Sequence, residues 1–372
     1  MMPSIAYNLD ISKLWAKISL DTVDTQLASG MIPDIAPEYT VFSGGFRDSP
    51  EWGSAGIMNP AWLLSWYADK ETTNATYATG QRYVDYLLSQ RDANGLLSYG
   101  LGDWIPVVNS PAGVTGTGQL VQDLQAMAKA AAALGRPADA ANYTALAAEA
   151  AAAFERAFFK SGAGAQTYPT QCAAGYALSL GFATDVAAAQ AWIVNDVRTY
   201  GCGNVTTSGE VGNVYALRAL ADAPGGPDAI WASLLRSNAP GYGWMLTMGE
   251  TALAESWTDA QGDSHIHAMY GHIDEYLYAH VAGIRQAPGG AGWRRVLFAP
   301  HPPLGDGPGA FVRASFESPR GLLASHARVG TNEAIELELT CAVGIECAAR
   351  LPMSGRIVPV PATGRPHVLR EE

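Results

Sequence analysis

The spacing of hydrophobic and polar positions changes once along the chain. Up to about residue 285, apolar residues recur at intervals of three and four, which places them on one face of an α-helix. Beyond that point the apolar runs become short, alternate with single polar residues and are broken by glycine and proline, as in half-buried β-strands. The pattern therefore predicts a domain of helices over residues 1–285 and a small β domain over residues 286–372.

Helical periodicity is clear in many segments of similar length. Glycine, proline, aspartate or asparagine stands at nearly every junction between them, as helix caps and turns require. Short and long loops alternate, which favours helical hairpins arranged around an axis. A helical solenoid is the alternative, although the sequence shows no repeat of fixed period. The predicted helices cover residues 11–27, 59–69, 76–90, 118–135, 138–159, 172–181, 185–201, 210–223, 228–238 and 272–284.

The sequence pattern of the β region is typical of a small antiparallel sandwich. Its runs are too short for helices and are separated by turn residues, which indicates hairpin-connected strands. The predicted strands cover residues 296–300, 310–318, 322–329, 334–340 and 356–360.

Composition and charge exclude several classes of function. The 372 residues suffice for one large and one small domain with a sizeable core. The net charge is −12, and no run of lysine and arginine could follow a phosphate backbone or an anionic membrane, so no nucleic acid partner is expected. No run of about 18 apolar residues occurs, so no membrane partner is expected. The first fifteen residues lack a basic segment followed by an apolar one, which favours a cytoplasmic over a secreted location.

The four cysteines argue against a structural metal site. Cys172, Cys202, Cys341 and Cys347 show no CxxC spacing and no histidines at zinc-finger intervals. Free buried thiols are the simpler interpretation. Cys341 and Cys347 alone are close enough in sequence to suggest a disulfide, and this alternative stays open.

Ionisable and aromatic residues cluster in one stretch, GETALAESWTDAQGDSHIHAMYG, at residues 249–271. A glutamate here could simply be a solvated residue on a helix face, and a histidine could be satisfied within a loop. Two histidines spaced by one residue, His265 and His267, could in principle bind a metal, but oxygen-rich loops often carry this pattern. We therefore expect no metal and no cofactor.

Several sequence blocks occur in a fixed order along almost the whole chain. They are YNLDISKLWAKISLDTVDTQLASGMIPDIAPEYTVFSGGFRDSPEWGSA (residues 7–55), GDW (102–104), GETALAESW (249–257), HAMYG (267–271), DEYLYAHVAGI (274–284), FAPHPP (298–303) and FESPRG (316–321). With these blocks the chain resembles the bacterial α-L-rhamnosidases of glycoside hydrolase family 78. The resemblance implies an (α/α)6 barrel of the six-hairpin glycosidase type, complete or incomplete at its N-terminus, followed by a C-terminal β-sandwich. It also implies an inverting hydrolase that releases L-rhamnose from a rhamnose-containing glycoside.

The resemblance gives roles to the polar stretch. An inverting glycosidase needs one carboxylic acid to protonate the leaving oxygen and one carboxylate to activate water, roughly 6.5 to 9.5 Å apart. Glu255 matches the family's general base, and His267 matches a histidine that contacts the sugar. Trp257 is expected to line the same site. Glu250 is expected at the surface or behind the site.

Two further stretches supply sugar-binding candidates. Trp52 matches the family tryptophan that lines the rhamnose pocket, where an aromatic face covers the C–H bonds and the methyl group of the sugar. Asp103 and Trp104 resemble the family's Gly-Asp-Trp element, an exposed turn at the mouth of the pocket. Asp48 and Glu51 flank Trp52, and helix N-terminal capping is their structural alternative.

The family resemblance does not assign the general acid to a residue of this chain. In family members it lies in a loop just upstream of the YNLDI block, and the chain as given starts too late to contain that loop. The periodic segments also fall short of the six pairs of a closed (α/α)6 ring, so we expect an incomplete barrel, which would have reason to form a homodimer. Asp48, Glu51 or Asp103 would then have to serve as the acid.

Three functions follow as hypotheses. The first is an α-L-rhamnosidase with Glu255 as its base. The second is a truncated, weakly active or inactive relative that keeps a rhamnose-binding pocket. The third is another (α/α)6 sugar enzyme, such as an epimerase or a lyase, which the matched blocks do not favour.

Overall fold

The computed structural model of the chain describes residues 2–162, 167–258, 264–301, 307, 309–330 and 334–371. The chain forms two compact units, and each contains more than one segment of sequence. The first consists of Met1–Ser12, Trp62–Asp69 and Gly271–Glu372, and the second of Lys13–Ala61 and Lys70–Tyr270. The domain boundary at residues 285 and 286 stays a prediction.

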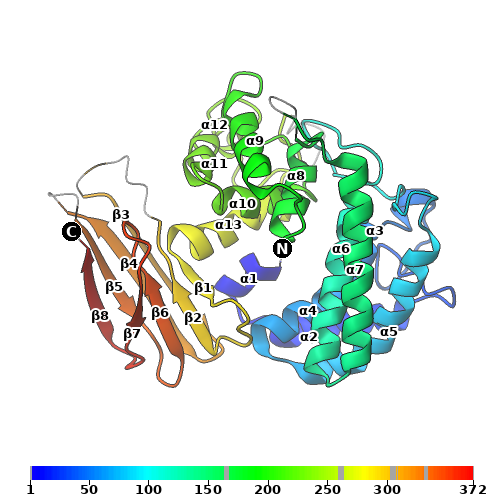
Figure 1. The fold of residues 1–372 in the computed structure, drawn as a ribbon, viewed down its shortest axis with the longest axis horizontal. Coiled ribbons are helices and arrows are strands. Elements are labelled where there is room, and N and C mark those ends of the chain that lie inside the picture. The colour runs from blue at the N-terminus through cyan, green and yellow to red at the C-terminus, as the bar shows by residue number, and fades with distance from the viewer. Residues whose placement is uncertain are drawn as a thin grey trace. The chain divides into compact units, whose positions relative to one another are not determined.

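The second unit is built from helices (Figure 1). Every helix that periodicity predicted before residue 271 is present, with ends that differ by a few residues. Helices α2 and α4 begin or end in the first unit. The helices are α2 (Ser12–Thr25), η1 (Gly44–Phe46), α3 (Pro50–Gly53), α4 (Ala55–Tyr67), α5 (Lys70–Ser89), α6 (Val114–Ala133), α7 (Pro137–Phe158), α8 (Gln171–Ser179), α9 (Val186–Thr199), α10 (Asn213–Ala221), α11 (Gly226–Leu234) and α12 (Tyr242–Thr247).

Helices α6 and α7 form a long hairpin and lie side by side in Figure 1. Helix α6 is buried on nearly all sides, whereas α7 buries one face made mainly of alanine and phenylalanine. Pro137 is the first residue of α7, where a backbone N–H would have no hydrogen-bond partner within the helix, so its absence does not destabilise the helix. The hairpin therefore contributes one inner and one outer helix.

The inner helices α6, α8 and α10 approach one another closely and carry polar side chains. A Cβ atom on Gly175 of α8 would lie 2.7 Å from the backbone nitrogen of Ala216 in α10, so only glycine fits there. The hydroxyl of Tyr215 in α10 donates to the amide oxygen of Gln122 in α6 at 2.5 Å, and both residues are buried. This hydrogen bond gives both buried polar groups a partner, and without one they would destabilise the unit.

The first unit carries all strands among the described residues, in two four-stranded sheets (Figure 1). One sheet has the order β1-β2-β6-β7, with β2 and β6 parallel and the other pairs antiparallel. The other has the order β3-β4-β5-β8 and is antiparallel throughout. The predicted sandwich is therefore confirmed as two sheets that are mostly antiparallel. The strands are β1 (Ile284–Gln286), β2 (Arg295–Phe298), β3 (Phe311–Ser318), β4 (Gly321–Val329), β5 (Ile335–Thr340), β6 (Glu346–Arg350), β7 (Ile357–Val360) and β8 (Pro366–Glu371).

An aromatic cluster joins the separate segments of the first unit. Tyr7 belongs to α1 (Met2–Asn8), and its ring meets Trp66, Trp293 and Phe316 edge-on at centroid distances of 5.0, 6.0 and 5.1 Å. The Tyr7 hydroxyl donates to the carbonyl of Ile284 at 2.7 Å. The unit also contains η2 (Met269–Gly271) in part. The predicted helix over 272–284 is present as the helix α13 (His272–Tyr276) followed by the π-helical turn η3 (Leu277–Val281), and it ends three residues earlier than predicted.

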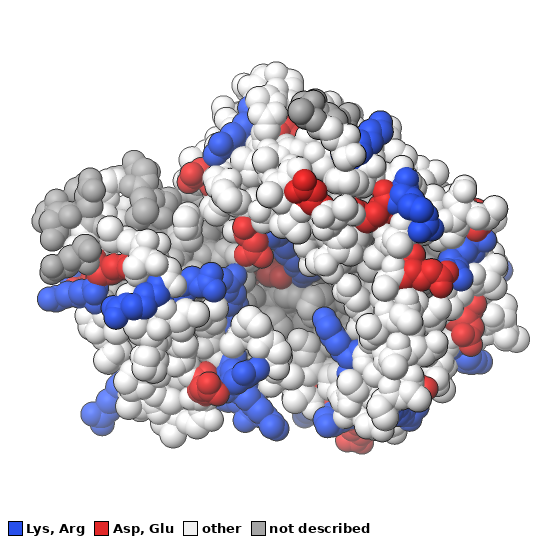
Figure 2. All heavy atoms as spheres, viewed as in Figure 1, with Lys and Arg blue, Asp and Glu red and all other residues white. Residues whose placement is uncertain are grey.

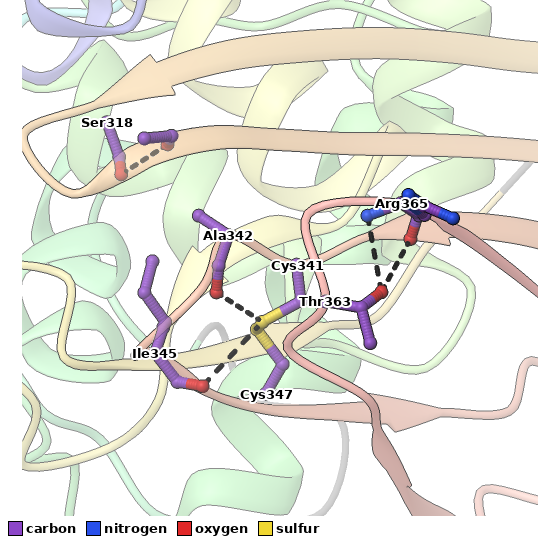
Figure 3. Close-up of a disulfide and its surroundings, with 8 residues drawn as sticks. Ser318, Cys341, Ala342, Ile345, Cys347, Thr363 and Arg365 are labelled. Carbon is purple, nitrogen blue, oxygen red and sulfur yellow. Dashed lines mark hydrogen bonds between the residues drawn. A yellow bond between two sulfur atoms is a disulfide. The ribbon is translucent and has the colours of Figure 1, made fainter.

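The open question about the cysteines is answered by the structure. Cys341 and Cys347 form a disulfide with a Cα–Cα distance of 6.3 Å (Figure 3). Cys172 and Cys202 carry free thiols, the first buried and the second exposed. The bridge fixes the turn that connects β5 to β6.

The surface agrees with the charge pattern of the sequence. Acidic and basic side chains are dispersed over the face drawn in Figure 2, most of which is uncharged. Within the described part of the chain, none of the helices has both the length and the apolar character needed to cross a bilayer.

Candidate functional site

The turn that carries the Gly-Asp-Trp element organises the site through Asp103. Its carboxylate accepts hydrogen bonds from the backbone amides of Gly209 and Gly212 at 2.8 and 2.7 Å. The residue is only 6% exposed, so the expectation of an exposed acid at a pocket mouth does not describe Asp103. Burial raises the pKa of its carboxyl to about 6, against the lowering effect of the two amides. Asp103 thus anchors the loop over residues 209–212.

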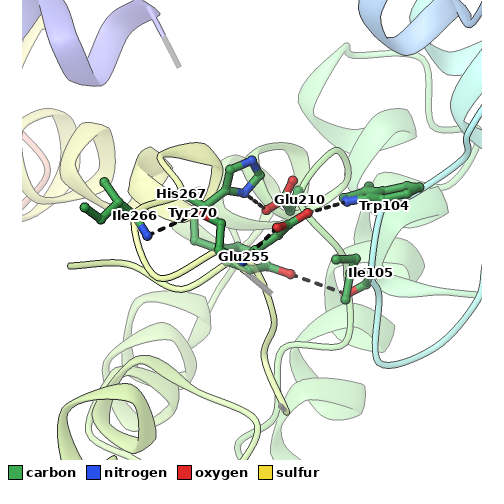
Figure 4. Close-up of polar contacts among 8 residues, drawn as sticks. Trp104, Ile105, Glu210, Glu255, Ile266, His267 and Tyr270 are labelled. Carbon is green, nitrogen blue, oxygen red and sulfur yellow. Dashed lines mark hydrogen bonds and ion pairs between the residues drawn. The ribbon is translucent and has the colours of Figure 1, made fainter. Parts of the chain in front are cut away.

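Trp104, the next residue, holds Glu255. Its indole Nε1–H donates to Glu255 Oε1 at 3.1 Å (Figure 4). The backbone N–H of Ser264 donates to the other oxygen, also at 3.1 Å, and Glu255 N donates back to the Ser264 carbonyl at 2.9 Å. The Trp104 hydrogen bond is the main cause that lowers the pKa of Glu255, and the nearby His267 adds to it. The carboxylate is therefore fixed in position and ionised at neutral pH.

His267 lies beside the same carboxylate and is held by a residue that the sequence analysis missed. His267 Nδ1 contacts Glu210 Oε1 (Figure 4). The backbone N–H of His267 donates to the Leu253 carbonyl at 2.8 Å. Glu210 is buried, and its own N–H donates to the carbonyl of Trp104 at 2.9 Å. The signal that could have found Glu210 is a single acid between two glycines in the non-periodic stretch TTSGEVGN.

Aromatic rings stand around Trp104. Trp52, from the short helix α3, meets the Trp104 ring edge-on at 6.4 Å and an interplanar angle of 85°. Phe46, from η1, meets it at 5.8 Å and 84°, and its own ring is exposed. Trp52 and Trp104 are therefore close to each other and, through Trp104, to Glu255.

Glu51 and Asp48 flank Trp52, and burial raises the pKa of both carboxyl groups. The Glu51 pKa reaches about 7, although the Thr115 hydroxyl donates to Glu51 Oε1 at 2.5 Å. Asp48 accepts a hydrogen bond from the Tyr86 hydroxyl. Glu51 lies in the first turn of α3, where an acid also complements the helix dipole. With a pKa of about 7, Glu51 keeps a protonated fraction at neutral pH, as a general acid requires.

Trp257 is placed differently from what we expected. Its side chain is only 1% exposed, and its Nε1–H donates to the Ser208 carbonyl at 2.8 Å. The ring packs on Tyr270 at 3.8 Å and on Tyr242 at 5.0 Å. A ring enclosed in this way has no free face for a sugar, so its placement does not support the predicted substrate contact. Trp257 instead supports the segment that carries Glu255.

His265, the other histidine of the polar stretch, contacts a different glutamate from His267. His265 Nδ1 lies 3.0 Å from both carboxylate oxygens of Glu250, and the His265 side chain is exposed. Among the residues that the structure describes, no group of three or more histidine, cysteine, aspartate or glutamate side chains is arranged to hold a metal ion.

The chain is similar in sequence to two curated α-L-rhamnosidases. The chain is 28% identical over 357 residues to an α-L-rhamnosidase of Streptomyces avermitilis, which covers 92% of the chain and 33% of that protein. It is 26% identical over 360 residues to an α-L-rhamnosidase of Formosa agariphila, covering 91% of the chain and 37% of that protein. The chain thus spans about a third of the length of the curated relatives it matches.

A solved structure agrees in fold. The Streptomyces avermitilis α-L-rhamnosidase complexed with L-rhamnose superposes with a TM-score of 0.83 at 25% identity, over 99% of this chain and 36% of that one. The model of the bacterial α-L-rhamnosidase C-terminal domain matches residues 283–358. The model of the bacterial α-L-rhamnosidase six-hairpin glycosidase domain matches residues 1–281, and the chain therefore belongs to that family.

Proposed function

We propose that the site hydrolyses terminal α-L-rhamnosyl linkages with inversion at the anomeric carbon, and that Glu255 is the general base. The observation that carries the proposal is the fixed, ionised carboxylate of Glu255 between the Trp104 indole and the Ser264 amide. A base must be ionised to accept the proton of the attacking water. The rhamnosidase names of the relatives support a rhamnose-containing glycoside as the substrate.

Glu51 is the proposed general acid. Its pKa of about 7 leaves a large protonated fraction at neutral pH, and its neighbour Trp52 packs on the tryptophan that holds Glu255. Asp48 is the weaker candidate because a hydrogen bond from Tyr86 already stabilises its ionised form. Asp103 is disfavoured because both of its oxygens accept hydrogen bonds from backbone amides.

The substrate is proposed to bind against Trp52 and Trp104, with His267 as a hydrogen-bonding partner for its hydroxyl groups. Indole faces cover the apolar C–H faces of a sugar, and the methyl group of a 6-deoxy sugar adds apolar area to this contact. Asp103 is assigned a positioning role, since its carboxylate holds the loop that carries Glu210.

The test compares wild type with Glu255→Gln on an aryl α-L-rhamnoside. We expect the glutamine variant to lose at least 10²-fold in kcat/KM, since a catalytic base is worth about 10² to 10⁴ in rate. Glu250→Gln is the matched control, because it makes the same chemical change at a glutamate that contacts the exposed His265. Proton NMR during turnover should show the inverted anomer first.

Two outcomes would contradict the proposal. A folded wild-type protein without turnover, but with measurable binding of L-rhamnose, would favour the inactive rhamnose-binding relative. Turnover that survives the Glu255→Gln substitution would remove Glu255 from the role of base.

A further inference from the structure

We propose that Glu210 is a positioning residue of this site, which acts on the substrate through His267. Its carboxylate fixes the histidine ring with the Nδ1–H bond toward the protein and Nε2 toward the substrate. The inference rests on the proposed function for its effect on turnover, whereas the pairing itself can be tested without any substrate.

The two side chains differ sharply in exposure. The Glu210 side chain is 1% exposed, whereas that of its contact partner His267 is 32% exposed. One ring nitrogen therefore faces a buried carboxylate, and the opposite nitrogen lies on the exposed side of the ring. Figure 4 shows the Glu210 and His267 side chains directed at each other, with Glu255 and Trp104 in the same group of contacts.

The loop around Glu210 is held so that its carboxylate stays in place. Asp103 binds the amides of Gly209 and Gly212 on either side of it, and the Glu210 N–H donates to the Trp104 carbonyl. A Cβ atom on Gly209 would lie 2.1 Å from that carbonyl oxygen, so the close approach requires glycine. The Gly-Asp-Trp turn thus holds Glu210 through its backbone and Glu255 through the Trp104 indole.

The chemistry of histidine gives this contact its consequence. A neutral imidazole carries its proton on either nitrogen, and a partner on one nitrogen decides which form is present. A carboxylate at Nδ1 favours the Nδ1–H form of the ring. The opposite nitrogen, Nε2, is then the acceptor that faces a sugar hydroxyl.

The His267 ring also lies beside the proposed base. Besides Glu210, the ring faces Glu255, whose ionised form it stabilises. Tyr270 interacts electrostatically with both glutamates. Glu210 therefore holds in place a ring that acts on Glu255.

The first experiment uses the wild-type protein alone. Nitrogen-15 NMR of histidine-labelled protein, with the His267 signals assigned by their loss in His267→Gln, reports which ring nitrogen carries a proton between pH 5 and 9. We expect Nδ1 to stay protonated throughout this range. A neutral ring with its proton on Nε2 and a bare Nδ1 would overturn the proposal, with or without rhamnosidase activity.

The second experiment compares Glu210→Gln with Glu250→Gln, which make the same change beside the two histidines of the polar stretch. We expect Glu210→Gln to change which ring nitrogen of His267 carries the proton, because the carboxylate partner of Nδ1 is lost. We also expect it to reduce kcat/KM about 10-fold, with the acidic limb of the pH profile moved to higher pH. Glu250→Gln should leave the His267 signals and kcat/KM within twofold of wild type.

An unchanged His267 tautomer, or an unchanged kcat/KM, in a folded Glu210→Gln protein would overturn the proposal. If Glu210→Gln does not fold, the wild-type tautomer decides the question. A wild type with the expected NMR signature but no rhamnosidase activity would refute the proposed function while leaving the Glu210–His267 pairing in place.

Discussion

Trp104 donates its indole N–H to Glu255 across 3.1 Å, although the two residues are 151 positions apart in sequence. The bond joins the Gly-Asp-Trp turn to the loop with the proposed base. The backbone carbonyl of Trp104 also accepts from Glu210, so one residue sets the positions of two carboxylates. A hydrogen bond to a charged acceptor stabilises the charged form, and here it is the main cause of the lowered pKa of Glu255.

Trp104→Phe removes that donor and keeps an aromatic ring. We expect the pKa of Glu255 to rise toward its ordinary value. The base works only when ionised, so the acidic limb of kcat/KM should move to higher pH. Loss of one charge-assisted hydrogen bond, worth about 1.5 kcal/mol at this partly exposed position, corresponds to about a 10-fold lower kcat/KM. A pH profile identical to that of wild type would contradict this role for the indole.

Glu51→Gln tests the proposed acid. The acid must be protonated and its pKa is about 7, so wild-type activity should decline as the pH rises above 7. The glutamine variant should lose this alkaline limb and about 10² to 10⁴ in kcat/KM on substrates with poor leaving groups. Activated aryl rhamnosides need less protonation, so their loss should be much smaller. An equal loss on both substrate types would argue for a structural effect, and Asp48→Asn is the matched control.

The same substitution should change how stability depends on pH. Burial raises the Glu51 pKa from its ordinary 4.5 to about 7, so its protonated form favours the folded state. This contribution is fully present below pH 4.5 and is lost as the pH rises through 7, with an upper bound of about 3 kcal/mol. Glu51→Gln cannot titrate, and its unfolding free energy should vary less between pH 5 and 8. Urea denaturation at several pH values measures this difference.

The helices could be predicted because their periodic segments are long. The elements that the pattern missed are short: α1 has 7 residues, α3 has 4 and α12 has 6, too few to display a helical period. Strand β8 begins at a proline, and β6 contains two alanines, which have low β propensity. Local pattern therefore identified the framework but not the short pieces that position Trp52.

The candidate residues were named in part, for a related reason. The family resemblance pointed to Trp104, Glu255 and His267, which the fold brings together. The sequence does not show which side chains become buried, so Trp257 was expected at the substrate, although tertiary packing encloses it. Glu210 was missed because its role depends on a histidine 57 positions away.

Asp103→Asn should destabilise the protein while leaving its helices intact. The aspartate accepts from two backbone amides, and an asparagine side chain has only one acceptor oxygen, so one buried N–H loses its partner. We expect a loss of about 1 to 3 kcal/mol in the free energy of unfolding and a lower kcat/KM through displacement of the 209–212 loop. Asp24→Asn, at an exposed position, is the control. Equal stability of the two variants would contradict the anchoring role.

Replacing both Cys341 and Cys347 by serine should weaken the first unit. The bridge closes a loop with a sequence separation of 6, so it removes only a modest amount of chain entropy from the unfolded state. Loop-closure arithmetic for this length gives about 2 kcal/mol. Thermal unfolding of the double variant should match that of reduced wild type. Cys202→Ser, which removes an exposed free thiol, should leave the unfolding temperature unchanged.

Trp52→Ala and Trp257→Phe should separate a substrate contact from a structural support. The Trp52 ring is half-buried and packs on Trp104, so its removal should raise KM for an aryl rhamnoside at least 10-fold with a small effect on stability. Trp257 is enclosed and donates to the Ser208 carbonyl, so Trp257→Phe should cost about 1 to 3 kcal/mol of stability and leave KM nearly unchanged. The opposite result, a KM effect confined to Trp257→Phe, would mean that the polar stretch opens in solution and exposes this ring. In that case the substrate would bind against Trp257, as the sequence alone predicted.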